Sequence, residues 1–207
     1  MGFVKQQSAE IVDLDERKHE RDCFSLKLQL FDIDPAVRRW AARDLTGCPD
    51  SAAVLVEQLQ REQDSSVREI ILTSLIHIGD EEAVLGLVLC LRSEEASLRN
   101  EAIEAMKLLP EAVSPIMGKL LKDADPDVRI FAVNVLESLR SEQVERWLKE
   151  VIEEDSHINV CATAVDLLSE VGTTYSLDTL MHLKERFAHE PYICFAADLA
   201  MKRIRNT

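Results

Sequence analysis

The sequence predicts an all-α protein: a right-handed solenoid of about six helix pairs, about twelve helices in all, without a sheet. The first observation behind this prediction is a repeat. Six apolar anchor positions recur at steps of 30, 31, 30, 32 and 33 residues. The anchors are Val37, Val67, Leu98, Val128, Val160 and Ile193. A period near thirty residues is typical of stacked helical units that pack only against their neighbours.

The second observation is the apolar phase inside each unit. Four residues after the anchors lie Ala41, Ile71, Ala102, Ala132, Ala164 and Ala197. Eight residues after them lie Leu45, Leu75, Met106, Leu136, Leu168 and Met201. Positions separated by four residues share one side of an α-helix, so each anchor begins a helix with one buried side.

The elements follow from the N-terminus. Residues 1–14 are mixed and mostly polar, and we expect a flexible arm there. Residues 15–207 then form one continuous solenoid, which begins with a capping helix over 15–31. The first helix of a unit starts at a capping residue, most clearly at Asp34-Pro35, Asp64-Ser65 and Asp125-Pro126. Gly79 and Gly172 are expected to end two of these helices in the left-handed conformation.

A second helix follows in the first five units. Its apolar markers are Val54-Leu55 with Leu59, Leu85 with Leu89, Ile116 with Leu120, Trp147-Leu148 with Val151, and Leu177 with Leu180 and Leu183. The sixth unit has a single helix that ends near Ile204. We therefore expect the stack to end on a first helix without a second helix after it.

Charge and cysteine usage restrict the partners. The formal net charge is −14, and no strong basic patch offsets it, so nucleic acids and anionic membranes are disfavoured. The N-terminal segment has no apolar stretch long enough for secretion or for spanning a bilayer. The five cysteines are spread singly without metal-binding spacing, which predicts reduced thiols and a cytoplasmic protein.

The segment Asp-Pro-Asp-Val-Arg-Ile-Phe-Ala-Val-Asn-Val-Leu at 125–136 resembles the HEAT repeat, and in particular the short bacterial variety of phycobilisome lyases. The resemblance covers about residues 28–204. It implies HEAT-like helix pairs and an Asp/Arg ladder that joins successive units. By position, the ladder comprises Asp34, Arg38, Asp64, Arg68, Arg99, Asp125 and Arg129. The last two units lack the arginine, so we expect the ladder to weaken toward the C-terminus.

Catalytic chemistry finds little support. Deoxyhypusine hydroxylase resembles this architecture and binds iron through His-Glu pairs two and three residues after the anchor, and none of the six units has that pair. No Ser-His-Asp order and no glycine-rich phosphate loop occurs either. We therefore expect no catalytic residue, no metal and no cofactor.

A partner is expected on the outward side of the first helices, which should line the concave side of the solenoid. Positions two, six and nine residues after the anchor point away from the core, and flanking residues add apolar and acidic groups. The candidate partner-binding residues are Arg39, Trp40, Arg43, Ile70, Glu101, Glu104, Ile130, Phe131, Asn134, Phe195 and Leu199. For Trp40, Ile70 and Phe131, packing between adjacent helices is an equally good interpretation. The apolar final helix predicts self-association or docking of a partner at the C-terminal end.

Three functions follow, in order of support. The first is a non-enzymatic, acidic, cytoplasmic adaptor that binds another protein or a peptide segment, by analogy an accessory to a bacterial signalling or assembly system. The second is a phycobilin-lyase-like or chaperone-like factor acting on a cofactor-bearing protein. The third, DNA repair of the HEAT-like glycosylase type, is disfavoured by the net charge.

Overall fold

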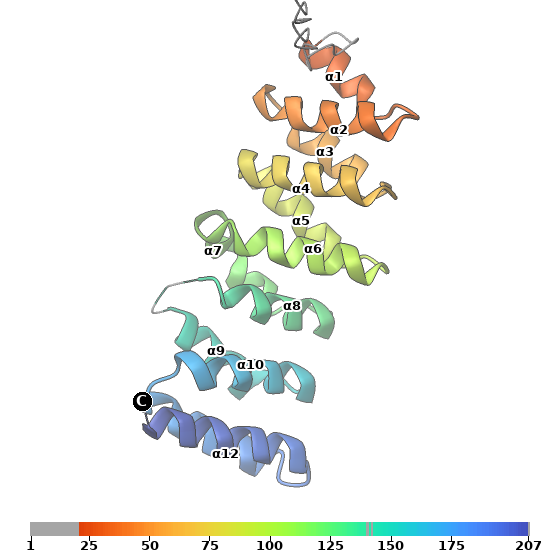
Figure 1. Ribbon diagram of the computed structural model, residues 1–207. Helices are drawn as coiled ribbons and strands as arrows, with labels where there is room; N and C mark the ends of the chain where they lie inside the picture. The colour runs from red at the N-terminus through yellow and green to blue at the C-terminus, as the bar shows by residue number, and fades with distance from the viewer. Residues whose placement is uncertain (1–20, 140, 142, 207) are drawn as a thin grey trace, which may run out of the picture.

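The computed structural model describes residues 21–139, 141 and 143–206, and within them it contains twelve α-helices and no strand. The helices form an elongated stack of two layers (Figure 1). The A layer comprises α2 (Pro35–Asp44), α4 (Ser65–Ile78), α6 (Ala96–Lys107), α8 (Pro126–Leu136), α10 (Ile158–Val171) and α12 (Pro191–Asn206). The B layer comprises α3 (Ala52–Leu59), α5 (Glu81–Cys90), α7 (Pro110–Leu120), α9 (Gln143–Glu154) and α11 (Leu177–Arg186). The predicted all-α solenoid is confirmed.

Five of the six anchor residues lie in the core, as the repeat predicts, and Val37 of the first unit is half-buried. Val67, Val128, Val160 and Ile193 are fully buried, and Leu98 is nearly so. The residues eight positions later are buried in all six units. Because each fully buried aliphatic side chain stabilises the fold by about 1.5 to 3 kcal/mol, these stripes hold each unit against its neighbours.

The predicted helix starts are confirmed in detail. Asp34, Asp64 and Asp125 each have an extended backbone and accept hydrogen bonds from main-chain N–H groups two or three residues later. The Asp34 carboxylate, for example, accepts from the Ala36 N–H at 2.8 Å. These bonds satisfy donors that a helix leaves free at its N-terminus.

One of the two predicted glycine caps is wrong. Gly79 ends α4 with φ 59°, in the left-handed conformation. Gly172 has φ −73° and ψ 152°, which is extended. The chain runs on from Gly172 through Thr173 into the short 3-10 turn Thr174–Ser176, so a left-handed reversal is not needed there.

The N-terminal helix is shorter than the expected 15–31. Among the described residues, α1 runs over Cys23–Gln29, and Asp22 caps it. Residues 15–20 and the expected arm at 1–14 lie outside the described residues. A disulfide joins Cys23 to Cys48 in the loop after α2, so the prediction of reduced thiols is wrong for these two cysteines. Their separation of 25 residues gave no signal in the sequence.

Helix α5 presents an apolar edge to solvent. Leu85 and Leu89, which mark this helix in the sequence, are 49% and 55% exposed, whereas Val84 and Leu87 are buried. Gly86 faces Val56 of α3 so closely that a Cβ atom would lie 2.1 Å from a Val56 methyl carbon. The glycine therefore sets the close approach of these two B-layer helices.

Candidate functional site

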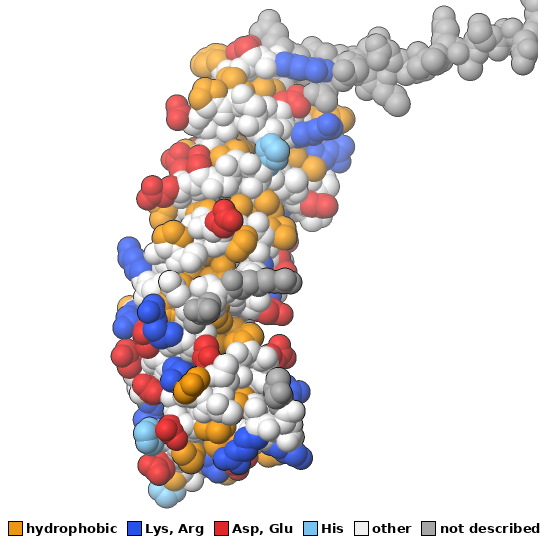
Figure 2. Space-filling model, turned by 90° about the vertical axis from the view of Figure 1, so that its left-hand side faces the viewer, with side chains coloured by type: hydrophobic (Ala, Val, Ile, Leu, Met, Phe, Trp, Pro, Cys, Tyr) orange, Lys and Arg blue, Asp and Glu red, His pale blue; other side chains and the backbone are white. Residues whose placement is uncertain are grey.

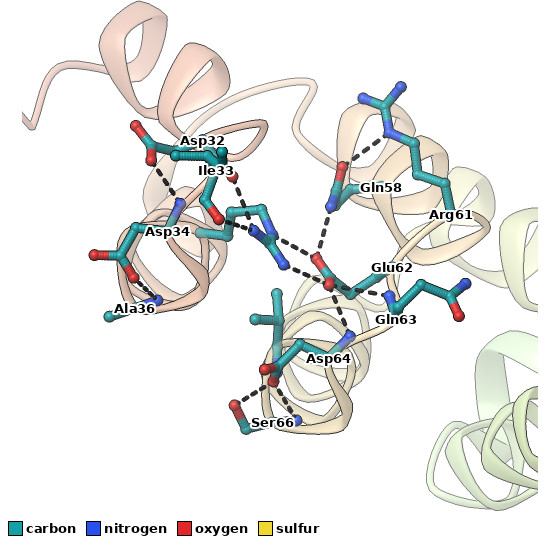
Figure 3. A network of polar contacts seen from close by, with 12 residues as sticks. Asp32, Ile33, Asp34, Ala36, Gln58, Arg61, Glu62, Gln63, Asp64 and Ser66 are labelled. Atoms are coloured by element: carbon teal, nitrogen blue, oxygen red, sulfur yellow. Dashed lines mark hydrogen bonds and ion pairs between the residues drawn. The ribbon is translucent and has the colours of Figure 1, made fainter.

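The inter-unit edge carries a ladder of arginines that join loops to helices. The Arg38 guanidinium donates to both Glu62 carboxylate oxygens at 2.7 Å and to the Asp32 and Ile33 carbonyls. Figure 3 shows Asp32, Ile33 and Glu62 around the point where these bonds meet. Arg38 thus joins the loop before its own helix to the loop before the next one.

The same arrangement recurs later in the chain. Arg129 donates to both oxygens of Asp155, at 2.6 and 3.0 Å, and to the carbonyls six and five residues before it. Arg99 donates to the two equivalent carbonyls at 2.7 and 3.1 Å and lies over the Phe131 ring of the next unit. Bidentate pairs of this kind fix orientation as well as distance.

The predicted ladder has the right arginines but mostly the wrong carboxylates. Asp34, Asp64 and Asp125 cap their helices, and the main acidic partners are Glu62, Glu95 and Asp155. Among the described residues, the one ion pair of Asp125 is a long contact of 3.9 Å with Arg92, which is not one of the predicted ladder arginines. The pairs span 24 to 27 residues, so no fixed spacing reveals them.

The ladder also extends beyond the point where it was expected to weaken. In the fifth unit Cys161 takes the arginine position, and the guanidinium of Arg186 from α11 lies beside it. It donates to the carbonyls of Ile152, Glu153 and Asp155, and it lies 3.3 Å from the Cys161 sulfur.

The ladder carboxylates Glu62 and Asp155 are satisfied by fixed partners, whereas among the described residues the buried Arg68 Nε and Glu101 Oε2 have no hydrogen-bond partner. Burial acts to raise the pKa of Glu62, but the Arg38 pair and bonds from the Asp64 N–H and Gln58 outweigh it and lower the pKa to about 2. Burial likewise acts to raise the pKa of Asp155, but the bonds from Arg129 and from the His157 N–H, together with the nearby positive charge of Arg129, outweigh it and lower the pKa. Both carboxylates are held ionised by fixed partners, which suits a structural role.

The A face is the second candidate surface; it comprises the side chains of the A-layer helices that point away from the B layer. At its N-terminal end Arg39, Trp40 and Arg43 are exposed, and the Arg43 guanidinium lies 5.4 Å from the Trp40 ring centre. This end of the face is basic and aromatic.

The middle of the A face is less open than the sequence indicates. Ile70, Ile130 and Phe131 are half-buried and pack against the core. Glu101 is half-buried and lies 3.4 Å from Arg68, so it belongs to the inter-unit edge. Glu104 is exposed and pairs with Lys107 at 3.1 Å.

The C-terminal part of the A face combines a groove with exposed apolar residues. A groove of about 240 Å³ lies between α8 and α10. Its lining residues are Val133, Asn134, Glu137, Thr163, Asp166, Leu167 and Glu170. On α12, Tyr192, Phe195 and Leu199 are 62%, 66% and 43% exposed. Among the predicted residues, Asn134, Phe195 and Leu199 therefore lie in this region, while Arg39, Trp40 and Arg43 lie at the far end of the stack.

Part of this groove lies outside the positions that the sequence predicts to point outward. Glu170 lies ten residues after its anchor, one position past the set expected to point outward. Each residue turns the helix by about 100 degrees, so Glu170 lies at the edge of the outward set, and it lines the groove toward α8 of the preceding unit. A wider angular range would have included it.

The described residues contain no candidate metal cluster and no candidate membrane-spanning helix, and one side of the stack shows how its charges are distributed. No group of three or more His, Cys, Asp or Glu side chains among these residues could hold a metal ion. Within the same residues, no helix is long and apolar enough to cross a bilayer. Figure 2, which looks onto the left-hand side of Figure 1, shows acidic, basic and hydrophobic side chains interspersed on this side of the stack.

A two-layered stack of helix pairs, joined by an arginine at each inter-unit edge, defines an α-solenoid repeat protein. The family model for HEAT repeats matches residues 26–107 and 114–193. The chain belongs to the HEAT-repeat family, which confirms the resemblance seen in the sequence.

The chain is also similar to several individual proteins. It is 27% identical over 153 residues to the bilin biosynthesis protein PecE of Mastigocladus laminosus, covering 72% of this chain and 56% of that protein. The chain thus spans little more than half the length of this relative. Among solved structures, an engineered protein matches 89% of this chain and 97% of its own, with 20% identity and a TM-score of 0.42. The complex of CpcE and CpcF of phycocyanin lyase from Nostoc sp. matches 100% of this chain and 98% of that chain, with 15% identity and a TM-score of 0.37.

Proposed function

We propose that this protein is a non-enzymatic scaffold that binds another protein or a peptide segment along its A face. The observation that carries the proposal is the contrast between its two charged surfaces. At the inter-unit edge the arginines of the ladder bind carboxylates and carbonyls of the chain itself. On the A face the side chains change from basic and aromatic to acidic to apolar, and those at its two ends, such as Arg43 and Phe195, are exposed to solvent.

Exposed aromatic and aliphatic side chains beside charged ones are typical of interaction surfaces. In HEAT-repeat proteins the apolar core residues recur from unit to unit, whereas the outward residues vary, so the outward side determines which partner is bound. The A face fits that role, with Trp40 near one end and Phe195 at the other.

Site-specific photo-crosslinking tests the proposal. The photoreactive residue para-benzoyl-phenylalanine replaces Tyr192 on α12, and in a matched control it replaces Tyr175. Both tyrosines are exposed, at 62% and 83%, but Tyr175 lies in the turn between α10 and α11. We expect irradiation in cells of the source organism to give a discrete protein adduct from position 192 and none from 175. Adducts from position 175 alone, or from neither position, would contradict the proposal.

The similarity to PecE supports a second candidate, a lyase-like or chaperone-like factor that acts on a bilin-bearing protein. Co-expression with a bilin and an apoprotein that accepts it distinguishes the two. A new visible absorption band that co-purifies with the acceptor only when this protein is present would favour the lyase-like function. Binding of the acceptor without a band would favour the scaffold.

A further inference from the structure

Two features of the A face adjoin each other at its C-terminal part. The first is the groove between α8 and α10, and the second is an apolar stripe on α12, defined as Tyr192, Phe195 and Leu199. Helix α10 packs against both α8 and α12, and the three helices follow one another along the stack (Figure 1). The stripe on α12 therefore lies on the helix next to the groove between α8 and α10.

The groove has an apolar floor and acidic walls. Val133 is fully buried and Leu167 half-buried at its base. Glu137 accepts a hydrogen bond from Lys107 at 2.8 Å, and this bond lowers its pKa. Asp166 and Glu170 are exposed and form no ion pair with the described residues. The groove therefore has two carboxylates free to pair with an incoming cation.

The stripe lies on one side of its helix. Tyr192, Phe195 and Leu199 are spaced by three and four residues, so their side chains are neighbours on the surface of α12. Single exposed apolar residues are ordinary, but three large ones at this spacing form a continuous patch. Burying it against a partner would remove that area from water.

We propose that the groove and the stripe together bind a basic amphipathic helix of a partner protein. Its Lys or Arg side chain would enter the groove between Asp166 and Glu170, and its apolar side chains would cover Phe195 and Leu199. The proposal rests on the proposed function of the A face and adds the chemistry of the partner. Adjacent packed helices lie about 8 to 10 Å apart, so about six or seven residues of a helix would separate the two contacts.

Charge fixes the direction of the bound helix. Beyond the stripe, the last turn of α12 carries Arg203 and Arg205, preceded by the exposed Lys202, and Arg203 donates to the Ser169 hydroxyl at 3.0 Å. A cationic residue of the partner is disfavoured beside these groups and favoured beside the carboxylates of α10. The basic end of the partner helix therefore lies toward α8.

Fluorescence anisotropy with two labelled peptides tests the inference. The first peptide is an alanine-rich helix with two leucines one turn apart and an arginine about seven residues from them. The second has glutamate in place of that arginine. We expect the arginine peptide to bind the wild-type protein about tenfold more tightly at low salt, with the difference falling as salt rises.

Matched protein variants locate the binding. Asp166→Asn with Glu170→Gln removes two charges from the groove at constant side-chain size and should abolish the preference for arginine. Asp178→Asn with Glu185→Gln removes two exposed charges from α11 in the B layer and should leave the preference intact. Phe195→Asp with Leu199→Asp should weaken both peptides, with helical content unchanged by circular dichroism.

The outcomes separate this inference from the proposed function. Equal binding of the two peptides, or equal effects of the two charge-removing variants, would contradict the proposal that the partner contributes a basic helix. A photo-adduct from position 192 would in that case still support the scaffold function. Sedimentation could also show that the wild-type protein is a dimer and that Phe195→Asp with Leu199→Asp makes it a monomer. That result would assign the stripe to a second copy of this chain and would overturn the inference as well. Absence of any A-face adduct would contradict the proposed function itself.

Discussion

At the scale of single residues, one arginine per unit determines how neighbouring units meet. Arg38 and Arg129 each bind two carbonyls of their own loop and a carboxylate of the next. Their planar guanidinium groups satisfy several acceptors at once, which a lysine would not reproduce. The arginines are visible in the sequence, whereas Glu62 and Asp155 are not, because loop length varies between units and shifts the acidic partner.

The Arg38–Glu62 pair makes stability depend on acid pH. The pKa of Glu62 falls from 4.5 to about 2 in the folded protein, so its contribution is complete above the unfolded value and is lost as the pH falls from about 5 toward 2. A shift of this size corresponds to about 3 kcal/mol. We expect Glu62→Gln to lower the free energy of unfolding at pH 7 and to flatten its decrease toward pH 3.

Urea unfolding at pH 7 and pH 3 measures this effect. Glu185→Gln is the control, because Glu185 is exposed on α11 and no ion pair or hydrogen bond holds it within the described residues. The control should retain the acid dependence of the wild type. An identical dependence in Glu62→Gln and the wild type would show that the pair contributes nothing.

At the scale of helices, sequence patterns predicted the elements well and their contacts less well. The Asp caps and the apolar anchors are local signals. The caps are confirmed at Asp34, Asp64 and Asp125, and five of the six anchors are buried. The exposure of Leu85 and Leu89 and the close contact at Gly86 depend on how α5 rotates against α3, which no local pattern specifies.

Glycine substitutions test the B-layer packing. Gly86→Ala places a methyl group against Val56 and should lower the free energy of unfolding by about 1 to 3 kcal/mol through overpacking. At Gly118 on α7 an added Cβ atom has no neighbour within 4 Å, so Gly118→Ala should raise the free energy of unfolding by about 0.5 kcal/mol through helix propensity. Thermal unfolding of both variants gives the comparison, and shifts of the same sign would refute the close approach of α3 and α5.

The disulfide tethers the shortest helix of the stack. Helix α1 has only seven residues, and Cys23 joins it to the loop after α2. Thiol titration of the denatured, unreduced protein should find three free thiols, those of Cys90, Cys161 and Cys194. Cys23→Ser with Cys48→Ser should lower the free energy of unfolding by about 3 kcal/mol, because a 25-residue loop is no longer closed in the unfolded chain. A reducing agent should have the same effect on the wild-type protein. Five free thiols in the untreated protein would contradict this bridge.

At the scale of the whole molecule, repetition explains the architecture and departures from it indicate the function. Every unit uses the same anchors, so the solenoid was predictable from the period alone. The groove was only partly predictable, because Asn134 and Asp166 lie at expected outward positions while Glu170 lies beyond them. The A face differs along its length. It is basic at the N-terminal end, acidic in the groove between α8 and α10, and apolar at the stripe on α12, so a partner would bind it in one orientation.

The central claim is that a protein partner covers the A face. Hydroxyl-radical footprinting of the partner complex tests it most directly, because the two layers expose comparable residues. Trp40, Phe195 and Leu199 on the A layer are 40%, 66% and 43% exposed, and Leu85, Leu89 and Met181 on the B layer are 49%, 55% and 42% exposed. We predict that the partner slows oxidation of the A-layer set, most strongly at Phe195 and Leu199, and leaves the B-layer set unchanged. Protection of Leu85, Leu89 and Met181 with no change at Phe195 and Leu199 would contradict the claim.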